Sequence, residues 1–486
     1  MSNSSLKQKT ISGVGWSAAD ALLGHGVTFI VGIVLARILS PAEYGLIGIC
    51  TIFTTVLTGM VDSGFSNSLI RKKEVTNNDY NTMFITNMLM SIGLYAVLFF
   101  SAPYISFFFD RPELTSLVRA MGLLLIIQAL SLVQYTKLTK RIDFKTRTKA
   151  SLLAALLSGA IGIGMALSGF GVWSLVGQQL SNKAIFTVCL WVYNKWLPKL
   201  SFDKNSFRYM WGFGWKLMLS GLLDRIWREI YQVVVGKFYS PATLGQYSRS
   251  KEYANLFSSN ITIIIQRVTF PSLAALQDDK TRMVAAYRKI IKLTMFVTAV
   301  CMISLAAISE PFIYCLIGPK WHQAATFLPL ICISMSFFPL HAINLNMLQV
   351  QGRSDIFLYL EIIKKIIAIG PVCLGIFIDI YWMLVGSIVT GMIGFFLNSY
   401  YTGKSLNYSS WMQIKDVAPS YVLAMIIACS VFFFKYLPLS YFLILPIQIF
   451  VGTSVFFVIC ERVQFDEYKE LKTIVRDNVR KLQRRK

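Results

Sequence analysis

Long apolar segments separated by short polar connections recur along the whole chain. A bilayer core about 30 Å thick requires roughly 20 apolar residues in a helix, because a helix satisfies its own backbone hydrogen-bonding groups and lipid cannot. Segments of this kind are predicted at residues 11–37, 44–70, 80–102, 114–136, 149–168, 172–196, 209–236, 243–269, 290–308, 323–350, 356–378, 380–401, 417–434 and 439–460. The pattern therefore predicts an all-α polytopic membrane protein of about fourteen transmembrane helices.

The polar connections leave no room for a soluble catalytic or nucleotide-binding domain. The longest internal one is the basic stretch around residues 271–292, and the only sizeable polar end is 461–486. We expect the first span to be retained, because it is longer than the apolar region of a signal peptide.

The composition supports a membrane protein and explains the basic charge. Of the 486 residues, 55% are hydrophobic and 15% charged, whereas about a quarter are charged in soluble proteins. The net charge of +23 would favour nucleic-acid binding only if the cations clustered on a water-facing surface. With the N-terminus inside, the inner connections hold 32 Lys and Arg residues and the outer ones hold four, namely Arg111, Lys237, Lys320 and Lys435. This asymmetry predicts a multi-pass membrane protein with both termini cytoplasmic, and no nucleic-acid partner is needed.

Two motifs occur twice, in step. Gly13-Val14-Gly15-Trp16 opens the first predicted span and Gly212-Phe213-Gly214-Trp215 the seventh, while Ser40-Pro41-Ala42 with Gly45 is matched by Ser240-Pro241-Ala242 with Gly245. Six spans separate the copies, so both enter the membrane from the same side and form a parallel repeat, with substrate sites expected between the halves. Locally, the first motif is interpreted as a helix start, with Gly for close packing and Trp as an interfacial anchor.

The repeat predicts the domain organisation. We expect a first six-helix lobe, a second six-helix lobe, two additional helices and a basic cytoplasmic tail, at residues 1–200, 201–402, 403–462 and 463–486.

Charged residues gather in the seventh and eighth predicted spans, where each is costly unless paired or facing a wet cavity. They are Asp224, Arg225, Arg228, Glu229, Arg249, Lys251, Glu252 and Arg267. One interpretation is neutralisation within the helix, since Asp224 with Arg228 and Arg225 with Glu229 are i,i+4 pairs. The other interpretation starts from the charge balance: five cations stand against three anions, which leaves an excess of two positive charges for an anionic ligand to balance. Arginine suits phosphate because its planar guanidinium donates two parallel hydrogen bonds. Both interpretations remain open at this point.

The first half leans acidic instead. Asp20, His25 and Asp62 lie in its first two spans, and buried carboxylates of this kind bind protons or Na⁺ in ion-coupled carriers. A helix-end role for Asp62 and a core histidine at residue 25 are the structural alternatives. The working hypothesis assigns substrate binding to Arg225, Arg228, Arg249, Lys251 and Arg267, and ion coupling to Asp20, His25, Asp62, Asp224, Glu229 and Glu252.

Signatures of metal, cofactor and nucleotide chemistry are missing from the sequence. The eight cysteines are scattered without a CxxC spacing, the three histidines form no HExxH, and there is no P-loop. We therefore expect no metal site, no cofactor and no catalytic residues, with a proton or sodium gradient as the energy source. A membrane glycosyltransferase or polymerase is kept as an enzymatic alternative.

Several strings together resemble one family. They are Lys9-Thr10-Ile11-Ser12-Gly13 with Trp16-Ser17-Ala18, the run from Leu35 to Gly45, the run from Asp62 to Ile70, Gly169-Phe170-Gly171-Val172-Trp173-Ser174-Leu175-Val176, the run from Arg267 to Asp279, and Gly318-Pro319-Lys320-Trp321. The chain resembles the polysaccharide transporter family over nearly its whole length, and within it the Wzx-type oligosaccharide flippases of the colanic acid exporter kind.

The resemblance implies the fold of the multidrug/oligosaccharidyl-lipid/polysaccharide exporters, with two six-helix lobes and two appended helices. It implies flipping of a polyprenyl-diphosphate-linked oligosaccharide, such as an exopolysaccharide, capsule or O-antigen repeat unit, from the inner to the outer leaflet of the bacterial plasma membrane. The diphosphate would be the anion held by the cationic residues. A monomer acting beside a polysaccharide polymerase and glycosyltransferases is expected. A lipid II flippase and a cation-coupled drug exporter are the alternatives within the same superfamily.

Overall fold

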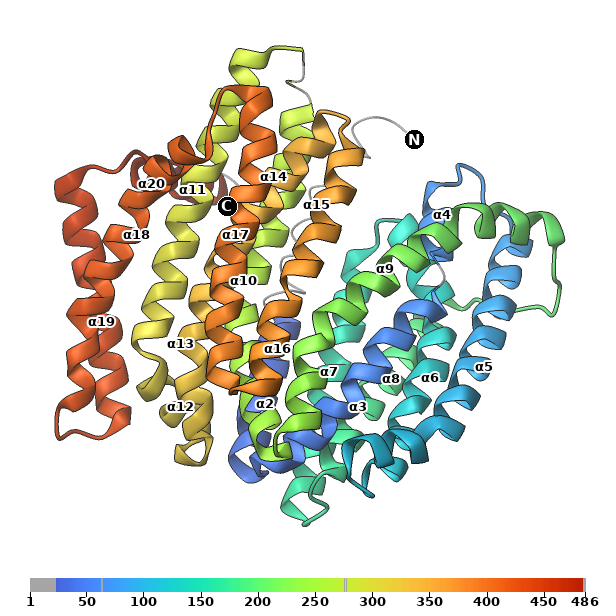
Figure 1. Cartoon of the computed structure of the whole chain (residues 1–486). Coiled ribbons are helices and arrows are strands. Elements are labelled where there is room, and N and C mark those ends of the chain that lie inside the picture. Colours follow the sequence, from blue (N-terminus) through green and yellow to red (C-terminus); the bar gives the residue numbers. More distant parts are fainter. Residues whose placement is uncertain (1–22, 63, 275, 277, 484–486) are drawn as a thin grey trace. The chain divides into compact units, whose positions relative to one another are not determined.

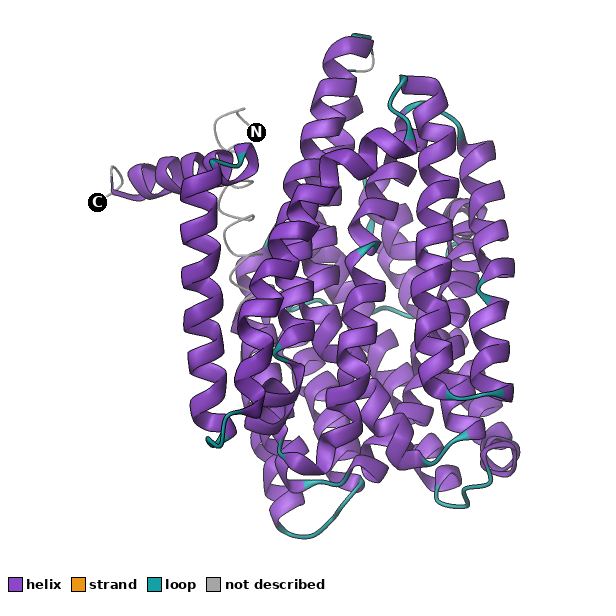
Figure 2. Cartoon of the chain, turned by 60° about the vertical axis from the view of Figure 1, so that its left-hand side comes forward, coloured by secondary structure: helices purple, strands orange, loops and turns teal. Residues whose placement is uncertain are grey.

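The computed structural model describes residues 23–483 except 63, 275 and 277 (Figure 1). Within this part of the chain the secondary structure is helical, and Figure 2 shows helices joined by short loops. The chain divides into two compact units, the first ending at Gly245 and the second beginning at Gln246. Each unit is a helical bundle with its own core.

The first unit contains eight described helices. They are α2 (His25–Ile38), α3 (Pro41–Val61), α4 (Phe65–Arg71), α5 (Asn77–Phe109), α6 (Leu114–Lys140), α7 (Phe144–Leu167), α8 (Trp173–Asn194) and α9 (Lys204–Phe238). Helix α7 packs on α8, α5 packs on α6, and α3 contacts both α6 and α9. Helix α3 thus packs against one helix from the middle of the unit's sequence and one from its end.

The second unit contains the remaining helices. They are α10 (Pro241–Ala274, which begins in the first unit), α11 (Lys280–Ala307), α12 (Ser309–Ile317), η2 (Pro319–Trp321), α13 (His322–Ser336), α14 (Phe338–Val350), α15 (Ser354–Ile367), α16 (Ile369–Phe377), α17 (Ile380–Leu406), α18 (Ser410–Phe432), η3 (Phe433–Tyr436), α19 (Tyr441–Val463) and α20 (Asp466–Gln483). Helix α11 packs against α13 and α18, and α18 packs against α19.

Nine helical segments in the described residues are long and apolar enough to cross a membrane. Others of comparable length, among them α9 and α10 with 35 and 34 residues, are more polar because they carry the charges noted above. The prediction of an all-α polytopic membrane protein is confirmed, while the count of about fourteen spans stays a prediction.

Three predicted spans contain helix breaks. The span at 44–70 divides into α3 and α4, where Gly64 adopts a φ of +71° that favours glycine. The span at 323–350 divides at Phe337, directly before the proline-containing first turn of α14, and 356–378 divides at Ala368. Proline lacks the backbone N–H that a continuing helix needs, and it fits the first turn of a new one.

The second GxGW motif lies inside a helix. Helix α9 begins at Lys204, because the Asp203 carboxylate caps it by accepting the backbone N–H groups of Asn205 and Ser206 at 3.2 and 3.0 Å. The Ser206 hydroxyl and these N–H groups hold the pKa of Asp203 below its usual value. The helix-start interpretation of the motif is therefore wrong for this copy, and the first copy lies outside the described residues.

Close packing explains a glycine of the second motif. A Cβ at Gly64 would lie 2.8 Å from the carbonyl oxygen of Gly214 and 3.0 Å from its Cα. The start of α4 thus meets the backbone of α9, and the Ser68 hydroxyl donates to the Met210 carbonyl at 3.3 Å. Small residues permit such approach between membrane helices.

The second pair of repeated motifs meets face to face within the first unit. A Cβ on Gly45 would lie 1.7 Å from the Pro241 carbonyl oxygen, and a Cβ on Gly245 would lie 1.9 Å from the Pro41 carbonyl oxygen. Each glycine therefore admits the backbone of the other copy. We call this reciprocal contact between the starts of α3 and α10 the glycine contact.

Candidate functional site

A polar cavity of about 460 Å³ opens inside the first unit. It is lined by Thr28 of α2, Thr51, Thr54, Thr55 and Thr58 of α3, Leu124 of α6, Gln178, Gln179, Asn182 and Lys183 of α8, and Arg225 of α9. A smaller cavity of about 160 Å³ shares Thr28 and Asn182 with it. Among the described residues of the lining, two are cations and none is an acid, so the cavity suits an anionic ligand.

Helix periodicity places the threonines on one wall. Thr51, Thr54, Thr55 and Thr58 follow an i, i+3, i+4, i+7 spacing, which puts them on one face of α3. The hydroxyls of Thr51 and Thr58 donate to carbonyls one turn earlier, at 2.8 and 2.5 Å. Because these donors are used inside the helix, the hydroxyl oxygens keep lone pairs for accepting hydrogen bonds from a ligand.

Arg225 reaches this wall from α9. Its Nη1 donates to the Thr55 carbonyl at 3.3 Å. The guanidinium lies over Gly59, where a Cβ would be 2.2 Å from Nη1. Gly59 lies one turn before Asp62, the C-cap of the same helix. A glycine on α3 therefore allows the arginine of this cavity to lie flat against the helix.

Lys183 is the second cation of the cavity, and sequence reasoning missed it. It lies on α8 next to Asn182 and one turn after Gln178 and Gln179. Four polar residues on neighbouring turns of one predicted span would have been the signal for it, since polar groups inside a membrane are costly unless they face a wet cavity.

The acidic candidate Asp62 has a helix-end position. It is the C-cap of α3 and its carboxylate accepts the Ser66 hydroxyl at 2.5 Å and the Ser66 N–H at 3.2 Å. This geometry confirms the helix-end alternative for Asp62, and a coupling role for its carboxylate stays a prediction.

Two other predicted cations are paired with acids on their own helices. Arg228 contacts Asp224 at 2.8 Å, with the arginine side chain 67% exposed. Arg249 contacts Glu252 at 2.7 Å and is only 11% exposed. The neutralising interpretation therefore holds for the first i,i+4 pair, whereas Arg225 turns to the Thr55 carbonyl of α3 and the Glu229 carboxylate accepts the side-chain amide of Gln232.

The remaining predicted site residues are located only in part. Lys251 is half-buried on α10. Arg267 lies on α10 and His25 begins α2, and for these two residues the structure describes the backbone only. Asp20 lies outside the described residues. As for metals, no cluster of three or more His, Cys, Asp or Glu residues occurs in the described part of the chain.

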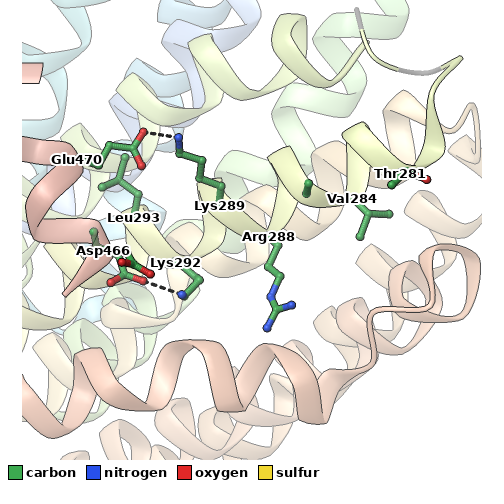
Figure 3. Close-up of a pocket in the computed structure, with 10 residues that line it drawn as sticks. Thr281, Val284, Arg288, Lys289, Lys292, Leu293, Asp466 and Glu470 are labelled. Atoms are coloured by element: carbon green, nitrogen blue, oxygen red, sulfur yellow. Dashed lines mark ion pairs between the residues drawn. The ribbon is translucent and has the colours of Figure 1, made fainter. Parts of the chain in front are cut away.

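A larger cavity, about 580 Å³, lies in the second unit between α11 and α20 (Figure 3). Its cations face acids: Lys289 contacts Glu470 at 2.8 Å and Lys292 contacts Glu467 at 3.1 Å. The third cation, Arg288, hydrogen-bonds Asp416 of α18 through Nη2 at 2.6 Å. Because its charges are balanced, this cavity fits an anionic ligand less well than the cavity of the first unit.

Comparisons with known proteins agree with this architecture. The chain is 25% identical over 386 residues to the succinoglycan biosynthesis transport protein ExoT of Rhizobium meliloti (strain 1021), covering 79% of this chain and 77% of that protein. It is 24% identical over 416 residues to the teichuronic acid biosynthesis protein TuaB of Bacillus subtilis (strain 168), covering 84% and 86%.

A solved structure shares the fold. The lipid II flippase MurJ in an inward closed conformation superimposes with a TM-score of 0.73 at 14% identity, over 95% of this chain and 99% of that one. The model of the family described as polysaccharide biosynthesis protein matches residues 34–326. Because this match spans more than half of the sequence, the chain belongs to the polysaccharide biosynthesis protein family.

Proposed function

We propose that this protein flips a polyprenyl-diphosphate-linked oligosaccharide from the inner to the outer leaflet of the plasma membrane by ion-coupled alternating access. The observation that carries the proposal is the cavity of the first unit, whose described lining includes Lys183 and Arg225 but no carboxylate. Two relatives support it, one named for transport in succinoglycan biosynthesis and one for teichuronic acid biosynthesis.

The chemistry of the lining matches the two parts of such a substrate. Arg225 offers a planar fork of donors and Lys183 a compact positive charge, and both bind phosphate oxygens well. The threonine wall of α3 offers acceptors and the amides of α8 offer donors and acceptors, which suit sugar hydroxyls. The drug-exporter alternative fits less well, because a cationic drug would be repelled by the two cations.

Arg225 and Lys183 therefore carry the proposed diphosphate site. Arg228 and Arg249 contribute less, because each is paired with an acid on its own helix. A proton or sodium gradient supplies the energy in this proposal. Among the acidic candidates, Asp62 is favoured because it lies on α3 one turn beyond Gly59, the residue that Arg225 covers.

The proposal includes a topology and a setting. Both termini lie in the cytoplasm, as the distribution of basic residues indicates. The protein acts as a monomer without a cofactor or catalytic step, on lipid-linked repeat units that glycosyltransferases supply and a polymerase consumes.

A reconstituted flipping assay tests the proposal. Proteoliposomes would receive a fluorescent polyprenyl-diphosphate oligosaccharide, and its arrival in the opposite leaflet would be followed under a proton gradient, a sodium gradient or neither. We expect flipping that one of the two gradients accelerates. Lipid II and a cationic drug are assayed in parallel as alternative substrates. Faster transport of either one would show that the proposed substrate is wrong.

Replacing Gly59 with Ala tests how Arg225 is positioned. The new methyl group would lie 2.2 Å from Nη1, so the guanidinium must move away from the Thr55 carbonyl. We expect flipping to slow by about fivefold, the value of one net hydrogen bond of about 1 kcal/mol. The assay above measures the rate.

Gly93→Ala on α5 is the matched control, because no neighbouring heavy atom lies within 4 Å of the position that its Cβ would take. Alanine is favoured over glycine in helices by about 0.5–1 kcal/mol, so neither substitution should reduce the amount of folded protein. An unchanged rate in Gly59→Ala would contradict the assigned position of Arg225.

A further inference from the structure

The last helix turns across the end of the preceding span. Helix α19, which is apolar and long enough to cross a membrane, ends at Val463, and Gln464 adopts a left-handed conformation with a φ of +59°. Helix α20 begins at Asp466 and runs across the end of α19 instead of continuing it (Figure 2). A helix that starts at the end of a span and crosses its axis is placed to lie along the membrane surface if it is amphipathic.

Ion pairs hold the first turns of α20 in this direction. Besides the pairs of Glu467 and Glu470 with lysines of α11, Lys472 contacts Glu461 of α19 at 2.6 Å. The Tyr468 hydroxyl donates to the same carboxylate at 2.9 Å. The orientation of α20 relative to α11 and α19 is thus fixed from two sides.

The first apolar residues of α20 pack on the core formed by α11 and α19. Tyr468 and Leu471 pack against a buried cluster that includes Phe296 of α11 and Cys460 of α19. At 100° per residue, the sequence continues this face within an arc of about 80°. The further apolar positions on it are Val475, Val479 and Leu482.

Cations lie along one side of this apolar face. Lys469, Lys472, Arg476 and Arg480 recur at intervals of three or four residues and so share one side of the helix next to the apolar positions. Residues 476–486 contain six cations and one acid, so at least five of these charges have no counter-charge within the segment. Three of the four acids of α20 lie in its first two turns, and two of them, Glu467 and Glu470, form ion pairs with α11.

We propose that residues 474–483 form an interfacial segment that inserts its apolar face at the bilayer boundary and binds anionic phospholipid headgroups. Basic amphipathic helices bind membranes through buried apolar area together with attraction to anionic lipids. Here α19 ends where α20 begins, and the first apolar residues of α20, Tyr468 and Leu471, already face the core formed by α11 and α19. The lipid is a surface ligand, distinct from a transported substrate, and the proposal does not depend on the proposed function.

Hydrogen exchange of the full-length protein tests the segment. The protein would be placed in nanodiscs of pure phosphatidylcholine or of an equal mixture with phosphatidylglycerol, and exchange of peptides covering 474–483 measured by mass spectrometry. We expect these amides to exchange at least about fivefold more slowly in the anionic discs, since one cation near an anionic surface is worth about fivefold in binding. High salt should reduce the difference because it screens the charges.

A triple variant, Arg476→Gln with Arg480→Gln and Lys481→Gln, should lose most of the lipid dependence. The matched control replaces three cations at the connection between α8 and α9 by Gln, namely Lys195, Lys199 and the first residue of α9, Lys204, and should retain it. Equal exchange in the two lipids, or a lipid dependence that survives the triple variant, would overturn the proposal. Protection that instead requires two protein copies per disc would assign the segment to a contact between copies.

Discussion

Replacing Arg225 with Ala is expected to lower the rate of oligosaccharide flipping by about 10- to 100-fold. A hydrogen bond to a charged group contributes about 1.5–3 kcal/mol, and the substitution removes the forked donor that faces the proposed diphosphate. Lys183→Ala should have an effect of the same order, because it removes the second cation of the cavity. The reconstituted assay measures both rates, normalised to the amount of inserted protein.

Two neighbouring substitutions separate this role from a general effect of charge. Arg228→Ala lies one turn away on α9 and removes an exposed arginine that Asp224 neutralises, so its rate should stay near that of the unchanged protein. Arg225→Lys keeps the charge but loses the planar fork, and we expect an intermediate rate. If Arg225→Ala and Lys183→Ala are inserted normally and both keep full activity, the substrate does not bind in this cavity.

Gly45→Val and Gly245→Val are expected to cause the largest loss of folded protein. Even a Cβ at these positions would lie 1.7 and 1.9 Å from carbonyl oxygens of the backbone, which cannot rotate away as a side chain could. Overpacking of a well-packed interior costs about 1–3 kcal/mol, and a backbone obstacle places these variants at the upper end or beyond. Thermal unfolding of the detergent-solubilised protein would measure the loss.

The glycine contact also predicts how the two effects combine. Because each substitution separates the same pair of helix starts, the double variant should lose less stability than the sum of the single variants. Gly164→Val on α7 is the control, since nothing lies within 4 Å of its Cβ position. Unfolding temperatures that match this control would mean that the helix starts separate at little cost.

The sequence predicted the membrane class and the apolar helices well, because both follow from hydrophobicity. The span predicted at 80–102 lies within α5, and the one at 439–460 nearly coincides with α19. The breaks at Phe337 and Ala368 were missed. Hydropathy reports that a segment lies in the membrane, and an interrupted helix has the same apolar content as a continuous one.

The candidate site was predicted only in part, for a related reason. Arg225 stands out as a charge in an apolar segment, but its partner was expected one turn along the helix at Glu229. The structure gives it the Thr55 carbonyl, because Gly59 leaves room for the guanidinium on another helix. Lys183 was missed because its significance depends on residues of α2, α3 and α9 that surround the same cavity.

The glycine contact has the geometry of an isologous interface, in which the same patch occurs on both sides and each copy supplies what the other needs. The first motif contains both groups that the contact needs, the carbonyl of Pro41 and the space at Gly45, since the proline carbonyl of one copy faces the glycine of the other. Two copies of a single six-helix polypeptide could therefore form the same contact as a symmetric dimer. A protein built by duplication and fusion of such a polypeptide would have inherited the glycine contact from the dimer. After the fusion, a larger residue at the glycine of either motif would still collide with the backbone of the other motif.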